Sequence, residues 1–249
     1  MEGRLARLSL QAIRATAALP YSDARVLARR LYSFGTIPRG PQYDRDFGPG
    51  DDPLAVLDLT SSGGARARLL QDYDASTHPG WLGFNRAGPG FGAALGFKLY
   101  ASPRPEALVM AFPVLADVLA RHEVRSFKVG RGITGLLRPD KIVAYFDNRR
   151  HLEAVASALS RALDGCPVQG VPFTAELAAD GLLSWGIDRP TQAGQPAESW
   201  RSWVTERLAA AILAVRRPGQ DPAGLVLAKL AAEGVENWIS VSSPNRVRQ

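Results

Sequence analysis

The sequence predicts an α+β fold, in which helices pack mainly on one face of an antiparallel-rich sheet and an N-terminal helical segment precedes that sheet. Two observations carry this prediction. Short apolar segments of strand length alternate with longer segments whose apolar residues recur at helical spacing. From residue 97 onward their order is strand, helix, strand, strand and helix, which places the helices mainly on one face and leaves the other free for chemistry.

Size and composition limit the domain organisation. The chain has 249 residues, of which 46% are apolar, enough for one large domain or for a core with an appended helical lobe. We divide it into an N-terminal helical segment and loop over 1–53, able to dock a substrate, and an α+β domain over 54–249. The single cysteine, Cys166, excludes an internal disulfide framework. No stretch approaches the ~18 continuous apolar residues of a membrane span, so we expect a cytoplasmic protein with no membrane partner.

The first 53 residues combine helical periodicity with a polar connection. Apolar positions over 3–34 predict two helices, interrupted at Pro20. Residues 35–53 are dense in Pro, Gly and Asp and indicate a loop, and a short helix or mixed segment follows over 54–73. The two helices form either a solvated basic face or a docking surface for an acidic peptide. Their basic residues are Arg4, Arg7, Arg14, Arg25, Arg29 and Arg30.

The rest of the chain alternates between strands and helices. Residues 80–84 and 95–101 flank a glycine-rich turn and predict a β-hairpin. The other regular segments expected are strands at 124–130, 141–146 and 237–241, an extended piece at 167–174, a mixed loop over 175–198, and helices at 105–121, 149–163, 199–213 and 222–233.

The predicted strands hold most of the lysines. The chain has 30 basic residues, only four of them lysines, and three of these four lie in strands: Lys98, Lys128 and Lys141. Because alternate residues of a strand share a face, Lys98 and Tyr100 emerge together about 7 Å apart, on the side opposite their apolar neighbours. Lys128 is likewise flanked by two apolar residues. One sheet face therefore gathers several polar side chains.

Further polar side chains follow the second of these strands. Pro139 favours an extended conformation for the residue before it, so Arg138 and Asp140 project to one side. Tyr145 adds a second phenol. Such a cluster is costly unless an anion occupies it. The formal net charge of +6 also suits an anionic partner, but leaves open a phosphate, a nucleic acid or an acidic peptide.

Several common sites can be excluded. The Gly-x-Gly-x-x-Gly at 130–135 follows a strand, but Pro139 stops the helix that a dinucleotide site needs. The glycine-rich turn before Lys98 lacks the downstream catalytic and metal-binding motifs of a kinase. No nucleic-acid motif stands out, so we expect no nucleic-acid partner. We also expect no cofactor and no metal, because the histidines are scattered: His78, His122 and His151.

Five short motifs in order carry a resemblance to a known family. They are FKLY (97–100), SFKV (126–129), RPDKIVAYF (138–146), VPFT (171–174) and SWR (199–201). On these the chain resembles the lyase component of class V lanthipeptide and thioamitide pathways, which is similar to a plant-pathogen effector of the Hop A class. More distantly it resembles the phosphothreonine lyase effectors of enteric bacteria.

The resemblance implies a reaction and its partners. A lyase of this kind removes phosphate by β-elimination from a phosphoserine or phosphothreonine of a precursor peptide, leaving dehydroalanine or dehydrobutyrine. A separate Ser/Thr kinase supplies the phosphorylated peptide. By the same resemblance, Lys128 matches the base that takes the α-proton and Lys98 the lysine beside the phosphate, while Arg138 and Arg201 match arginines that bind it.

The remaining site residues come partly from this comparison and partly from their own chemistry. The enteric lyases carry an acidic histidine where this chain has Tyr100, so we assign proton donation to Tyr100, with His78 as the rival. Asp140, Tyr145 and Thr174 are supporting residues. For Lys128 to act as a base, its ordinary pKa of about 10.4 has to be lowered by desolvation or by neighbouring cations.

A non-catalytic interpretation stays open. A single lysine in a strand is usually exposed or protects a sheet edge, and an arginine in the first turn of a helix usually lies on the surface. The alternative function is a non-catalytic binder of acidic or phosphorylated peptides that partners a kinase.

Overall fold

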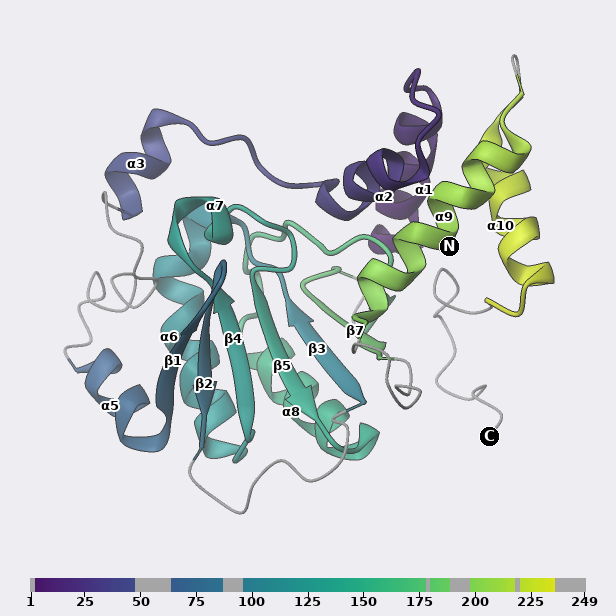
Figure 1. The fold of residues 1–249 in the computed structure, drawn as a ribbon. Helices are drawn as coiled ribbons and strands as arrows, with labels where there is room; N and C mark the ends of the chain where they lie inside the picture. The colour runs from purple at the N-terminus through teal and green to yellow at the C-terminus, as the bar shows by residue number, and fades with distance from the viewer. Residues whose placement is uncertain are drawn as a thin grey trace.

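A computed structural model describes residues 3–47, 64–86, 96–177, 180–188, 198–217 and 220–235. The predicted α+β fold is confirmed, with a seven-stranded sheet of order β1-β2-β4-β5-β3-β7-β6 in which every pairing is antiparallel (Figure 1). Its strands are β1 (Asp74–His78), β2 (Trp81–Asn85), β3 (Phe97–Ala101), β4 (Ser126–Gly130), β5 (Ile142–Phe146), β6 (Ala175–Glu176) and β7 (Leu183–Ile187).

Four of the helices begin where a short polar side chain accepts a backbone N–H. Asp23, Asn148, Ser199 and Asp221 each cap the helix that follows, which satisfies one of its unpaired donors. The helices are α1 (Arg4–Ala17), α2 (Ala24–Ser33), α3 (Pro41–Phe47), α5 (Ala65–Asp72), the 3-10 turn η1 (Pro105–Ala107), α6 (Leu108–Arg121), α7 (Gly132–Leu136), α8 (Arg149–Ala162), α9 (Trp200–Val215) and α10 (Pro222–Ala232).

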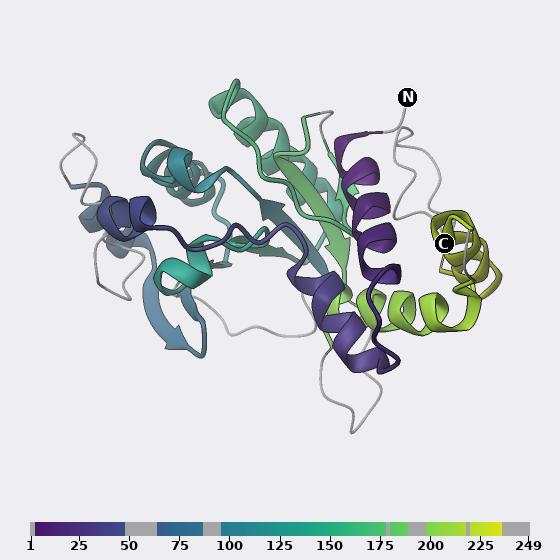
Figure 2. The ribbon, with the colours of Figure 1, turned by 90° about the horizontal axis from the view of Figure 1, so that it is seen from above.

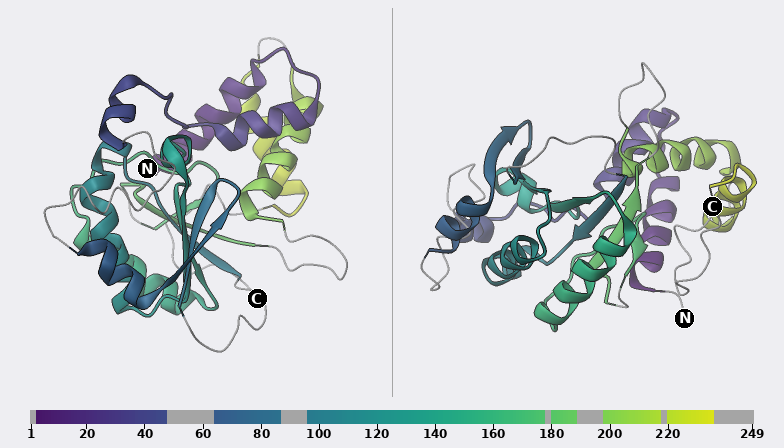
Figure 3. Two further views of the ribbon diagram at one scale, coloured as in Figure 1. Left: turned by 60° about the vertical axis from the view of Figure 1, so that its left-hand side comes forward. Right: turned by 90° about the horizontal axis from the view of Figure 1, so that it is seen from below.

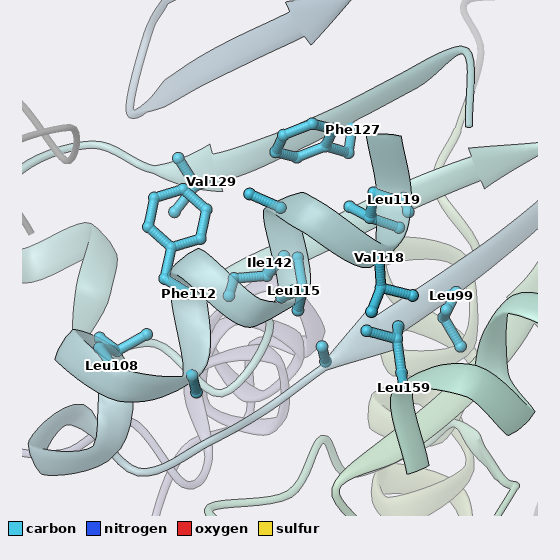
Figure 4. Close-up of a cluster of buried hydrophobic side chains, with 14 of the residues drawn as sticks. Leu99, Leu108, Phe112, Leu115, Val118, Leu119, Phe127, Val129, Ile142 and Leu159 are labelled. Carbon is cyan, nitrogen blue, oxygen red and sulfur yellow. The ribbon is translucent and has the colours of Figure 1, made fainter. Parts of the chain in front are cut away.

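The main hydrophobic core lies between the sheet and the helices α6 and α8, which stand behind the sheet in Figure 1. Phe112 of α6 lies beside Val129 of β4, and Leu115 of α6, Phe127 of β4 and Leu159 of α8 belong to the same cluster (Figure 4). All five side chains are almost fully buried. Because Phe127 and Val129 face this core, the residue between them, Lys128, faces the opposite side of the sheet.

A second hydrophobic cluster joins the two ends of the chain. Apolar residues of α1 and α2 pack with those of α9 and α10, and these four helices gather beside β7, away from α6 and α8 (Figures 2 and 3). Phe173, in the loop before β6, is fully buried in this cluster. Its backbone is left-handed (φ 65°), and its N–H donates to Ser9 Oγ at 2.9 Å. The helices of the N-terminal segment therefore share their core with the C-terminal helices.

The hairpin expected from 80–84 and 95–101 is wrong. Strand β2 pairs with β1 and β4, whereas β3 lies between β5 and β7. The apolar side chains explain the choice, because Phe84 stacks on Phe127 across β2 and β4 with ring centroids 4.6 Å apart. Of the turn expected over 85–93, residues 87–93 lie outside the described ranges.

Three other expectations need correction. The loop expected over 35–53 contains the short helix α3, whose Tyr43 and Phe47 are buried in the main core. The extended piece expected at 167–174 forms no strand: it makes an isolated bridge between Val168 and Pro103 and then turns at 172–174. The mixed loop expected over 175–198 contains β6 and β7. The strand expected at 237–241 falls outside the described residues.

A membrane-spanning helix is not found within the described part of the chain, where every helix is too short or too polar for that role.

Candidate active site

Strand register brings the predicted polar residues onto the face of the sheet opposite α6 and α8. Lys98 of β3 lies opposite Tyr145 of β5. In the next row, Val143 of β5 lies opposite Tyr100 on one side and Lys128 of β4 on the other. Lys98, Tyr100, Lys128 and Tyr145 therefore share one face within three neighbouring strands, as the alternation along each strand predicts.

Lys128 stands between two aromatic rings at the centre of this face. Its Nζ lies 4.1 Å from the ring centroid of Trp81 and 5.7 Å from that of Tyr145. Among the described residues it has no carboxylate partner. Burial, together with the nearby positive charge of Lys98, lowers the pKa of Lys128 to about 8. A substantial fraction of this amine is therefore neutral near neutral pH and available to take a proton.

Lys98 is held by an acidic residue that the sequence analysis did not single out. Its ammonium forms an ion pair with Asp188, just after β7, and lies 5.4 Å from the ring centroid of Tyr145. Asp188 also accepts a hydrogen bond from the backbone N–H of Trp200 at 2.9 Å. The start of α9 is thereby tied to the lysine side of the site.

Asp140 is the centre of a buried network that includes both predicted arginines. Arg138 donates to its two oxygens at 2.9 and 3.0 Å, and Nη1 of Arg201 lies 2.7 Å from Oδ2. The hydroxyl of Tyr32, from α2, donates to the same Oδ2 at 3.1 Å. Burial opposes ionisation of this carboxyl, but Arg201 and Arg138 outweigh it and hold the pKa of Asp140 well below its usual range.

The two arginines differ in accessibility. The Arg138 side chain is 27% exposed and its guanidinium carbon lies 4.6 Å from the ring centroid of Trp81. Trp81 is therefore shared between Arg138 and Lys128. Arg201 is only 1% exposed, because it lies behind Asp140 and donates from Nη2 to the carbonyl of Tyr32 at 2.7 Å. Arg138 is thus the arginine that a ligand meets first.

Tyr100 and Thr174 lie deeper on the same face. Tyr100 packs against Val143 and Val171, and its burial raises the pKa of the phenol well above the ordinary value. Thr174 Oγ1 donates to the carbonyl of Val171 at 2.6 Å and lies 2.8 Å from the hydroxyl of Ser184. Thr174 therefore holds the loop that covers Tyr100.

His78 lies nearer to solvent, on the outer strand β1. It pairs with Trp81, and its ring covers Gly83, because a Cβ at Gly83 would lie only 3.4 Å from the Cδ2 and Nε2 atoms of His78. Gly83 in turn lies opposite Lys128. The imidazole is thus on the face that carries Lys128, with β2 between their two strands, and its Nε2 lies 3.1 Å from Ser76 Oγ.

Three residues of the site were missed from the sequence: Tyr32, Trp81 and Asp188. Trp81 has the correct strand parity, but its place beside Lys128 depends on the pairing of β2 with β4, which was predicted wrongly. Tyr32 is brought to the site by the packing of α2, and Asp188 by its hydrogen bond to the start of α9. The local sequence does not indicate either contact.

No group of three or more His, Cys, Asp or Glu side chains that could hold a metal ion occurs among the residues that the structure describes.

Comparison with known proteins identifies the fold. Neither a protein-family model nor a curated protein matches the sequence. A solved effector protein from Pseudomonas syringae pv. tomato strain DC3000 is similar over 93% of this chain and 95% of its own, with a TM-score of 0.53 and 12% identity. At that identity the likeness shows a shared fold.

Two further solved structures are similar at lower scores. The type III effector and phosphothreonine lyase OspF from Shigella flexneri matches 63% of this chain and 89% of its own, with a TM-score of 0.42 and 14% identity. The phosphothreonine lyase SpvC, the effector protein from Salmonella, matches 84% of this chain and 97% of its own, with a TM-score of 0.40 and 15% identity.

Proposed function

We propose that this protein is a phosphothreonine or phosphoserine lyase that eliminates phosphate from a phosphorylated peptide. One observation carries the proposal: Lys128, an amine with a lowered pKa and no carboxylate partner among the described residues, lies against the same tryptophan ring as the partly exposed Arg138. A base next to an anion-binding guanidinium suits a substrate whose acidic C–H lies close to a phosphate.

The proposed reaction balances within the substrate. Neutral Lys128 takes the proton from the α-carbon of the phosphorylated residue. The electron pair forms the double bond between the α- and β-carbons, and the bond from the β-carbon to the phosphate oxygen breaks. The leaving phosphate accepts a proton from a donor in the site, so that the products are a dehydro residue and hydrogen phosphate.

The phosphate is held by charges of two kinds. Arg138 offers the donors of Nη1, because its Nε and Nη2 already donate to Asp140 and Tyr32. Lys98 offers a compact ammonium on β3. Arg201 is enclosed, so we assign it to holding Asp140, which in turn orients Arg138; Arg201 reaches the phosphate directly only if Asp140 moves aside.

Two side chains compete for the role of proton donor. Tyr100 keeps its proton, because burial raises its pKa, but its side chain is enclosed under the loop that contains Val171. His78 is exposed on the face that carries Lys128. The variants Tyr100→Phe and His78→Asn separate the two, since loss of the true donor lowers kcat about 10²- to 10⁴-fold.

The finer proposal concerns the biological substrate. From the motif resemblance alone, the substrate is a precursor peptide of a lanthipeptide-type product, phosphorylated by a separate kinase and processed in the cytoplasm. Tyr145 lines the site and Thr174 supports it in this proposal.

The test is a mass measurement on a phosphothreonine peptide. Elimination removes one phosphoric acid and leaves an unsaturated residue, whereas hydrolysis leaves the hydroxyl, so the two products differ by one water. The variant Lys128→Ala should lose about 10²- to 10⁴-fold in rate. Lys128→Arg should lose as much, because a guanidinium keeps the charge but stays protonated at every working pH and cannot take the α-proton. The surface variant Lys229→Ala is the matched control.

Two outcomes contradict the proposal. Full activity of Lys128→Ala excludes this residue as the base. Tight binding of the phosphopeptide by the wild-type protein, without any change in peptide mass, favours the alternative function of a non-catalytic phosphopeptide binder.

A further inference from the structure

The six arginines of α1 and α2 are engaged to different degrees. Arg4 donates to the carbonyl of Val168 at 2.7 Å, Arg14 forms an ion pair with Asp221 at 2.8 Å, and Arg30 lies 6.0 Å from the ring centroid of Tyr21. Arg7 also has an interaction partner.

Arg25 and Arg29 differ from these four. Both are exposed, and no acidic side chain within the described ranges pairs with either. These two guanidiniums are therefore available to a ligand.

Arg25 and Arg29 form one stripe with a residue of the site. Arg29 precedes Tyr32 by three positions and Arg25 precedes Arg29 by four, so the three side chains lie on one side of α2. The Tyr32 end of the stripe meets Asp140 and receives a hydrogen bond from Arg138 at 3.3 Å. At ~1.5 Å per residue, Arg25 lies about 10 Å along the helix from Tyr32.

We propose that the stripe formed by Arg25 and Arg29 binds acidic residues of the substrate peptide on one side of the phosphorylated residue. This inference rests on the proposed function for its substrate, but it adds a sequence preference. An extended peptide advances ~3.3 Å per residue, so a peptide anchored at Arg138 would place its residues two to four positions away along the stripe. The preference is one-sided, because α2 lies on one side of Arg138.

The experiment measures peptide binding independently of turnover. Three fluorescent phosphothreonine peptides are compared by anisotropy at low salt: one with two Glu residues two to four positions before the phosphothreonine, one with them after it, and one with Gln in their place. The proteins are the wild type, the double variant Arg25→Gln/Arg29→Gln, and Arg150→Gln/Arg161→Gln. The last pair removes the same charge from exposed positions of α8, on the opposite side of the sheet.

The inference predicts that one acidic peptide binds the wild type about three- to tenfold more tightly than the Gln peptide. Arg25→Gln/Arg29→Gln should abolish this difference, whereas Arg150→Gln/Arg161→Gln should leave it intact. The advantage should also shrink at high salt, because exposed ion pairs are screened. If both acidic peptides gain equally, or if the α8 variant removes as much, the effect reflects overall charge and the inference is wrong.

Measuring elimination with the same peptides separates this inference from the proposed function. If no peptide loses phosphoric acid, the lyase proposal fails while the binding comparison still decides whether the stripe docks acidic residues. If elimination occurs, Arg25→Gln/Arg29→Gln should raise KM for the favoured peptide and leave kcat unchanged.

Discussion

The Asp140→Asn variant gives a direct test of the buried network. Asp140 is almost fully buried, and its carboxylate is the counter-charge for Arg201, which is only 1% exposed. The substitution keeps the size of the side chain but removes the charge. Removing one partner of a buried ion pair typically costs about 3–5 kcal/mol, because the other charge stays buried without compensation. Arg138 is partly exposed, so the loss of its own ion pair adds little to this cost. We therefore expect Asp140→Asn to lower the free energy of unfolding by about 3 kcal/mol.

Urea denaturation followed by tryptophan fluorescence measures this loss. The midpoint should fall while the slope stays unchanged, and the melting temperature should fall by about 6–12 °C for a chain of this size. The control is Asp147→Asn, in which an exposed aspartate at the other end of β5 is changed in the same way. That variant should stay within about 0.5 kcal/mol of the wild type.

A double-mutant cycle checks the physical cause. Arg201→Met removes the buried charge itself, so Asp140→Asn should cost much less in that background than in the wild type. The folded-state pKa of Asp140 is depressed, so its contribution to stability is present above the ordinary carboxyl pKa and is lost only as the pH falls toward the depressed value. The loss in Asp140→Asn should therefore be constant between pH 6 and 8. A loss below about 1 kcal/mol, or an equal loss in the Arg201→Met background, would refute this account.

Three further predictions follow from the site. The value of kcat/KM should rise with pH, with an apparent pKa of about 8 that belongs to Lys128. Lys98→Gln should move this rise to higher pH, because the nearby charge of Lys98 lowers the pKa of Lys128. A rise that does not move would count against Lys128 as the base. In Gly83→Ala the new Cβ would lie 3.2 Å from Ser76 Oγ, so Ser76 should shift by a few tenths of an ångström and disturb its contact with His78 Nε2. If His78 is the donor, this variant should lower kcat more than KM, with no further loss in a His78→Asn background. The buried Lys141 has a pKa lowered to about 7, so the unfolded chain binds more protons above that pH. Lys141 should therefore contribute about 2 kcal/mol to the rise in the free energy of unfolding measured in urea from pH 7 to 9. Lys141→Met should lose this contribution, while the part due to the lowered pKa of Lys128 remains.

Local pattern was sufficient for the parts of the site that lie within single strands. A strand fixes the face of alternate residues, so Lys98 and Tyr100 could be placed from the sequence. Arg138 and Asp140 were expected in an extended segment but lie in the turn between α7 and β5, where two hydrogen bonds from Arg138 to Asp140 hold them together. The helices α1, α2, α6, α8, α9 and α10 were likewise indicated by their apolar spacing and caps.

What the sequence did not disclose depends on long-range packing. The pairing of β2 with β4 is set by the stacking of Phe84 on Phe127, which lie 43 positions apart, and this displaced the expected hairpin. Strand β1 is mostly polar, lies at a sheet edge and has no alternating apolar pattern. Tyr32 reaches Asp140 only because α2 packs against α9. In each case the deciding contact joins segments far apart in the chain, and neither local sequence indicates its partner.

The hydrogen bond from Arg201 to the carbonyl of Tyr32 spans 169 positions and has a consequence for biosynthesis. The ribosome releases α2 early and α9 late, with the whole sheet between them. Until α9 emerges, Leu27 and Leu31 of α2 lack the partner helix that buries them, and the Asp140 carboxylate lacks its enclosed guanidinium. The anion-binding half of the site is therefore completed only near the end of translation, so a nascent chain that stops before residue 200 carries both sheet lysines without a finished site.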